Sequence, residues 1–243
     1  MNESIILEKE NLKISKDDDS IFKIEFKSSE YSLINSLIKT RIIQGGSTDE
    51  RYKTITFNAH TVKTLEDFRN EKKISQGKKK LSVPDVAKMV HTLSIQLNYL
   101  LECENRTIIG YNEEDMIVIN DEKFVFLSSE LVTDIDSEGT EMAIISCPFS
   151  SNEFFFSPEM LKITEIPSKI HYKTAYFSLG VLLVYMLLED DDFYKDYLKH
   201  KCSEKIIEYL NNDPIKNTRI YWFLSRCLVE EAKNRSIIHI QNL

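Results

Sequence analysis

The first part of the chain alternates short apolar segments with polar turns, a pattern typical of β-strands. Such segments fall at 5–7, 12–14, 21–26 and 52–57. Between the last two, apolar residues recur near helical spacing from Ser32 to Ile43 and stop before a pair of glycines, which can end a helix. This part therefore predicts a small β-rich unit with one helix.

Farther along, the pattern becomes mainly helical. Thr64 and Ser82 each stand three positions before an aspartate and predict helix N-caps, and Pro84 suits the first turn of the second helix. From Thr174 onward the helical pattern continues to the end, with a break near Asp213-Pro214.

Two apolar segments at 116–119 and 123–127 flank a polar turn and predict a β-hairpin. We expect this to be the single hairpin of an otherwise helical second part. The pattern thus divides the chain into residues 1–62, with strands and one helix, and residues 63–243, which are mainly helical. The expected class is α+β.

The composition favours a folded intracellular protein that does not bind nucleic acid. Of the 243 residues 42% are hydrophobic, and the net charge of −8 lacks the basic excess typical of nucleic-acid binding. The four cysteines are dispersed, without metal-ligand spacing, which indicates free thiols in a reducing compartment. No apolar segment reaches the roughly 20 residues of a membrane span.

The chain is rich in Ile, Lys and Asn and poor in Gly, Ala and Pro, which suggests an AT-rich genome. A large DNA virus or a reduced parasite would fit this composition. We expect a cytoplasmic location, in the host cytoplasm if the source is viral.

Three segments of the second half carry a family resemblance. They are Phe156-Ser157-Pro158-Glu159-Met160, Ala175-Tyr176-Phe177-Ser178-Leu179-Gly180-Val181, and the ending from Arg226 to Arg235. In order and spacing they resemble the "APE", "DxWSLGV" and "CL..DP..R" motifs of the protein kinases. The resemblance implies a two-lobed fold with a small β-rich N-terminal lobe and a larger helical C-terminal lobe. Because that family has five strands and a helix ahead of the hinge, we expect at least one strand of the small lobe here to be lost or unrecognisable in the sequence.

The parts that bind nucleotide in a kinase are missing. The phosphate-cradling loop needs glycines near the N-terminus, and none of the six glycines lies in the first 44 residues. Lys23 and Lys27 are weak candidates for the strand lysine, and Glu30 for its glutamate partner. We interpret them as residues of a solvated strand face instead.

The catalytic positions implied by the resemblance are also changed. Gly110 stands where the catalytic aspartate belongs, and no Asp or Glu occurs from residue 105 to 112. Asp115 replaces a metal-binding asparagine and is expected in a solvated acidic turn. Ser128 replaces the "DFG" aspartate and, being neutral, cannot replace a carboxylate as a magnesium ligand. Ala175 replaces an aspartate that braces the catalytic loop.

The architectural residues remain. The resemblance makes Glu159 and Arg235 an ion pair that ties the segment around "APE" to the helical lobe. The apolar segment from Tyr176 to Met186 is expected to form the buried central helix. Trp222, with its aromatic neighbours, is expected in the core of a late helix.

The predicted function is that of a pseudokinase, a kinase-like scaffold that acts by binding a protein partner, with no catalytic residues, cofactor, nucleotide or metal. Two alternatives stay open: a divergent active serine/threonine protein kinase, and a structural assembly component with a borrowed kinase fold. The acidic stretch Glu189-Asp190-Asp191-Asp192 is either a docking loop for a basic partner or a solvated loop.

Overall fold

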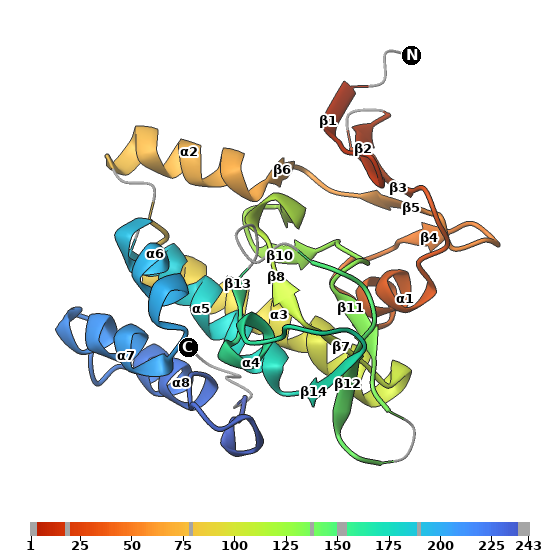
Figure 1. The fold of residues 1–243 in the computed structure, drawn as a ribbon. Coiled ribbons are helices and arrows are strands. Elements are labelled where there is room, and N and C mark those ends of the chain that lie inside the picture. The colour runs from red at the N-terminus through yellow and green to blue at the C-terminus, as the bar shows by residue number, and fades with distance from the viewer. Residues whose placement is uncertain are drawn as a thin grey trace.

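The structure, a computed structural model, describes residues 4–17, 20–77, 80–136, 139–149, 155–188 and 191–237. Over these residues the fold is mixed α+β, with a small β-sheet region and a helical part. Figure 1 shows the N-terminal sheet in red and orange at one end of the molecule and the C-terminal helices in blue at the other.

The N-terminal part forms one antiparallel sheet in the order β1-β2-β3-β5-β4. Its strands are β1 (Ser4–Glu8), β2 (Leu12–Lys16), β3 (Ile21–Phe26), β4 (Ser47–Thr48) and β5 (Thr54–Asn58). All four predicted strands are present. Of the two expectations for the fifth strand, lost or unrecognisable, the second holds, because β4 completes a set of five. Its two residues are too few for any periodicity to reveal it.

Helix α1 (Tyr31–Lys39) follows β3 and shares the core of the sheet. It ends earlier than the predicted range, since Thr40 is its C-cap and Arg41 has a left-handed φ of 60°. Ile42 and Ile43 lie beyond the helix and are buried all the same. They are apolar because they pack into the N-terminal core. Their spacing happens to continue the helical periodicity, so the sequence pattern predicts helix at these two residues as well.

The two predicted N-caps are confirmed. The Thr64 hydroxyl accepts a hydrogen bond from the Asp67 backbone N–H at 3.0 Å and starts α2 (Leu65–Gln76). Ser82 forms a capping box with Asp85 and starts α3 (Val83–Glu104), the longest helix of the described residues. Each cap satisfies backbone N–H groups that the first turn leaves without partners.

The C-terminal half is built around one buried helix. The helices of this half are α4 (Pro158–Leu161), α5 (Thr174–Leu188), α6 (Asp191–His200), α7 (Ser203–Asn212) and α8 (Arg219–Cys227), with 3-10 turns η1 (Glu113–Asp115) and η2 (Ala232–Asn234) around them. α5 is buried on nearly all sides, as predicted. It contacts α3, α6, α7 and α8. The break predicted near Asp213 is where α7 ends.

The predicted hairpin is present and belongs to a sheet in the order β10-β9-β6. Its strands are β6 (Val62–Thr64), β9 (Met116–Ile119) and β10 (Lys123–Phe126). The expectation of a single hairpin is incomplete, because three further strand pairs occur. They are β7 (Arg106–Ile108) with β11 (Val132–Asp134), β8 (Gly110–Tyr111) with β13 (Phe155–Phe156), and β12 (Met142–Ile145) with β14 (Ser168–His171). Their partners are distant along the chain, so no local pattern announces them.

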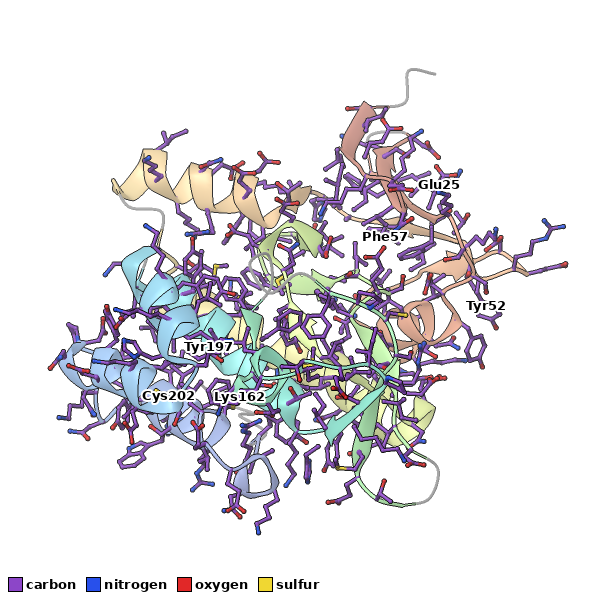
Figure 2. The ribbon with its side chains drawn as sticks, in the orientation of Figure 1. Glu25, Tyr52, Phe57, Lys162, Tyr197 and Cys202 are labelled. Carbon is purple, nitrogen blue, oxygen red and sulfur yellow. The ribbon has the colours of Figure 1, made fainter. Side chains whose placement is uncertain are left out.

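The molecule has two hydrophobic cores, and the β9–β10 hairpin lies between them. Phe57 belongs to the N-terminal core and Tyr197 to the helical core, and both are labelled in Figure 2. Successive side chains of a strand point to opposite faces. Accordingly, one face of β9–β10 enters the helical core and the other enters the N-terminal core. The first face carries Met116, Val118, Phe124 and Phe126, and the second carries Ile117, Ile119 and Val125, followed by Leu127.

Trp222 is not a core residue, contrary to expectation. Its side chain lies on α8 with 56% of the residue exposed, whereas Phe223 is 1% exposed. Helical geometry explains the difference, because the buried stripe of α8 is already filled by other residues at helical spacing. They are Ile220, Phe223, Leu224 and Cys227.

None of the described helices is long and apolar enough to cross a membrane. Of the acidic stretch 189–192, Glu189 and Asp190 lie outside the described residues, and so do the side chains of Asp191 and Asp192. Its suggested docking role therefore stays a prediction.

Candidate functional site

A cavity of about 290 Å³ lies where the N-terminal sheet meets the loops next to the hairpin. The turn between β1 and β2 lines one side, and Asn112, Asp115 and residues 127–130 line the other. Asp115 and Ser128 both face this cavity, so the structure brings these two predicted positions together. Gly110 and Ala175 are not part of its lining; both are buried in the helical half.

Asp115 is engaged by a lysine from the N-terminal sheet. Lys9 Nζ lies 2.8 Å from Asp115 Oδ1 and 3.4 Å from Glu114 Oε2. The Asp115 side chain is 15% exposed, so the expectation of a solvated acidic turn is wrong for this residue. The Lys9 ammonium group supplies the positive charge beside the carboxylate that a metal ion would otherwise supply.

A second contact crosses the same cavity. Asn11 Nδ2 donates to Glu130 Oε1 at 2.5 Å, directly beyond Ser128 and Ser129. Lys9 and Asn11 both belong to the β1–β2 turn, so this turn is attached at two points to the opposite wall. No group of three or more His, Cys, Asp or Glu side chains that could hold a metal ion occurs in the part of the chain that the structure describes.

The lysines considered for nucleotide binding point away from the core of the sheet. On β3 the buried side chains are Phe22, Ile24 and Phe26, and the strand alternation places Lys23 on the other face. Lys23 Nζ pairs with Glu25 on its own strand at 2.7 Å, and Lys27 is a largely exposed residue.

Among the described residues, the glutamate candidate Glu30 contacts a serine and no lysine of β3. Glu30 is the N-cap residue of α1 and accepts a hydrogen bond from Ser28 at 2.6 Å. The structure therefore does not join any of the three candidates into a lysine–glutamate pair of the kind a kinase uses on its nucleotide.

Gly110 is held in a space that admits no side chain. It pairs with Phe156 between β8 and β13, and a Cβ atom at residue 110 would lie 2.4 Å from the Phe156 ring. The glycine is thus required by the close approach of the aromatic ring. An aspartate at this position could not be seated without moving Phe156.

Tyr111 lies next to Gly110 and is completely buried. The Tyr111 ring packs against the Phe126 ring, with the ring centroids 5.0 Å apart. The Tyr111 hydroxyl is buried and has no hydrogen-bond partner among the described residues. Burial raises the pKa of the Tyr111 hydroxyl well above its ordinary value. A charged catalytic group next to such a residue would be strongly penalised by desolvation.

Ala175 lies in the interior of the helical half, where it is fully buried. Its methyl group cannot form a hydrogen bond. Three residues farther along α5, the Ser178 hydroxyl donates a hydrogen bond to the Ile109 carbonyl at 3.4 Å, which is a weak link between α5 and the segment before Gly110.

Glu159 and Arg235 form the predicted ion pair. Arg235 Nη2 donates to Glu159 Oε2 at 2.9 Å, and its Nη1 donates to Glu159 Oε1. The Arg235 side chain is completely buried and that of Glu159 is 23% exposed. The guanidinium group also lies 4.7 Å from the Phe177 ring and donates to the Val229 and Glu230 carbonyls at 2.7 and 2.8 Å.

A second buried ion pair was not predicted. Arg69 on α2 pairs with Glu113 at 2.5 Å, and its guanidinium group lies 5.3 Å from the Tyr185 ring of α5. Arg69 is one of 31 basic residues, and nothing in its local sequence distinguishes it from solvated lysines and arginines. Only the tertiary packing brings α2 onto the η1 turn.

No protein-family model matches the chain, and no curated protein matches it by sequence. Function is therefore inferred from the motifs and from the geometry of the cavity.

We expect Lys9→Ala to free the β1–β2 turn with little loss of global stability. The pair is partly exposed, and such pairs contribute about 1 kcal/mol or less. Amide hydrogen exchange of residues 8–12 should accelerate, because the turn loses one of its two attachments. Lys39→Ala, which removes an exposed lysine on α1 away from this turn, is the matched control and should leave exchange of the turn unchanged. Unaltered exchange in Lys9→Ala would show that the contact does not hold the turn.

Proposed function

We propose that the chain is a two-lobed, protein-kinase-like scaffold without phosphotransfer activity, which acts by binding protein partners. The arrangement of elements supports the kinase-like part. Five strands and one helix precede the segment at 58–63, and the long α3, the β9–β10 hairpin and the buried α5 follow in the order that the resemblance implies. The Glu159–Arg235 pair links two of the three motifs that carry the resemblance.

The ion pair between Asp115 and Lys9 is the observation that supports inactivity most directly. It is the one carboxylate left at the two metal-binding positions that the resemblance implies, and it is already paired with Lys9. Metal-dependent phosphoryl transfer needs carboxylate or amide oxygens that are free to coordinate the cation. A metal ion at Asp115 would have to displace an internal ammonium group.

The packing between the sheet and the hairpin supports the same proposal. Ile117, Ile119, Val125 and Leu127 reach into the core that holds Ile14, Ile24 and Phe57. Aliphatic side chains therefore join the two parts directly. The cavity of about 290 Å³ between them is lined by three carboxylates, Glu10, Asp115 and Glu130, and by a single ammonium group, that of Lys9. This excess of negative charge disfavours a nucleoside triphosphate.

The decisive experiment is a thermal-shift titration with ATP or ADP in the presence of Mg²⁺ or Mn²⁺. We expect no measurable change in Tm. A nucleotide present at a hundred times its Kd would stabilise the fold by about 2.7 kcal/mol, or roughly 5–10 °C for a chain of this size.

The variant Asp115→Ala makes the titration specific, because alanine offers no oxygen to a cation, whereas an asparagine amide would. A metal-dependent shift in the wild type that Asp115→Ala abolishes would contradict the proposal and favour the divergent active kinase. An assembly component with a borrowed fold would also bind no nucleotide. It is distinguished by native mass measurement, which would show a stable stoichiometric assembly in place of reversible partner binding.

A further inference from the structure

The outward face of α8 carries an arginine–tryptophan–arginine stripe. Arg219, Trp222 and Arg226 are all exposed, and their spacing of three and four residues places them in one row along the helix. The opposite face of α8 is fully used in packing against α5. We call this row the α8 stripe.

Trp222 is the part of the stripe that packing does not explain. It is the only tryptophan of the chain, and 56% of the residue is exposed. Its ring makes an edge contact with Tyr221, with centroids 5.3 Å apart, and the Tyr221 hydroxyl donates to Asn211 at 2.9 Å. Tyr221 thereby supports the indole from one side. Tryptophan and arginine are the residues most enriched among those that dominate binding energy at protein interfaces.

The charge of the stripe contrasts with that of the molecule. The whole chain carries a net charge of −8, yet the α8 stripe presents two guanidinium groups. The two exposed arginines give the stripe a local positive charge next to an exposed indole.

We propose that the α8 stripe is a docking surface for an acidic protein segment that places an apolar side chain against Trp222 and carboxylates against Arg219 and Arg226. Guanidinium groups recognise carboxylates through paired hydrogen bonds, and the indole supplies a broad apolar contact. The charge complementarity selects an acidic segment. The overall negative charge disfavours a nucleic acid or an anionic membrane, which need more extended basic surfaces. The inference rests on the proposed scaffold function for its biological role.

The position of Trp222 makes the test direct, because it is the only source of tryptophan fluorescence. The probe is a synthetic amphipathic peptide of glutamate and leucine, and its charge-reversed lysine–leucine counterpart serves as the control. We expect the acidic peptide to shift the emission of the folded chain to shorter wavelength in a saturable manner, and the basic peptide to leave it unchanged. Addition of salt should weaken the binding.

Variants assign the binding to the stripe. With a labelled acidic peptide, Arg219→Glu/Arg226→Glu and Trp222→Ala should each weaken binding by at least about tenfold. Lys39→Glu/Arg51→Glu makes the same change in net charge at exposed residues of the N-terminal part and should weaken it far less. Circular dichroism verifies that all variants fold.

Four results would overturn the proposal. They are an unchanged emission, equal losses in the two double variants, comparable affinity for anionic vesicles or duplex DNA, and concentration-dependent dimerisation abolished by Trp222→Ala without peptide binding. The last would identify a second copy of the chain as the occupant. None of these results depends on nucleotide binding, so failure here is distinguishable from failure of the proposed inactivity.

Discussion

Replacing Arg235 with alanine is expected to lower the free energy of unfolding by about 3–5 kcal/mol, because it leaves the Glu159 carboxylate without its buried partner. The change also removes the guanidinium contacts to the Val229 and Glu230 carbonyls and to the Phe177 ring. For a chain of this size the melting temperature should fall by roughly 10 °C. Differential scanning calorimetry measures both quantities.

Two further variants make this measurement specific. Arg235→Lys keeps the charge but cannot reproduce the paired hydrogen bonds, so an intermediate loss is expected. Lys233→Ala removes a cation two residues away whose side chain is 67% exposed, and it should be nearly neutral. A loss below about 1 kcal/mol in Arg235→Ala would mean that the pair does not join α4 to the C-terminal segment energetically.

Gly110→Asp, which places a carboxylate where the resemblance implies a catalytic aspartate, is expected to prevent stable folding. The new Cβ would overlap the Phe156 ring at 2.4 Å, and the carboxylate would enter the buried region around Tyr111. Overpacking of this kind costs about 1–3 kcal/mol, and an unpaired buried charge adds to it. Urea unfolding followed by circular dichroism would record the loss.

The steric and electrostatic parts can be separated with Gly110→Ala, which adds only the Cβ atom. Combining it with Phe156→Leu should relieve the overlap, so the double variant should lose less stability than the sum of the two single changes. Additive losses, or a well-folded Gly110→Asp protein, would show that β8 and β13 can separate at no great cost. The region would then be open enough for a catalytic group.

Local chemistry explains which elements the sequence predicts well. Thr64 and Ser82 act through hydrogen bonds to backbone groups three residues away, so their side chains announce a helix start wherever it packs. The same holds for the alternation in β3 and for the uniformly apolar α5. These signals concern neighbours along the chain, and the structure confirms them.

Elements and positions that depend on residues far away in the sequence are not predicted. β4 and β8 have two residues each and exist only because another strand lies beside them. From the sequence, Trp222 is expected in the core of a late helix, but the buried face of α8 is occupied by other residues.

At the candidate site, the residues that differ from the kinase motifs can be identified from the sequence, but the contacts that these positions make cannot. The absence of an acid at Gly110 and the neutral Ser128 follow from reading the sequence against the family motifs. The ion pair between Lys9 and Asp115 cannot be predicted in this way, because the two residues are more than a hundred positions apart in the sequence. The role of Ser178 at the Ile109 carbonyl likewise becomes visible only when α5 and the β7–β8 segment are seen together.

The two-sided β9–β10 hairpin has a consequence for the order of events during synthesis. The N-terminal sheet closes its core with Ile117, Ile119, Val125 and Leu127, which leave the ribosome long after β5. Domains commonly fold in order of their emergence, but here the first sixty residues lack part of their own interior until the hairpin arrives. The nascent sheet would therefore expose apolar surface for the time needed to translate α2 and α3, an interval in which a chaperone could bind it.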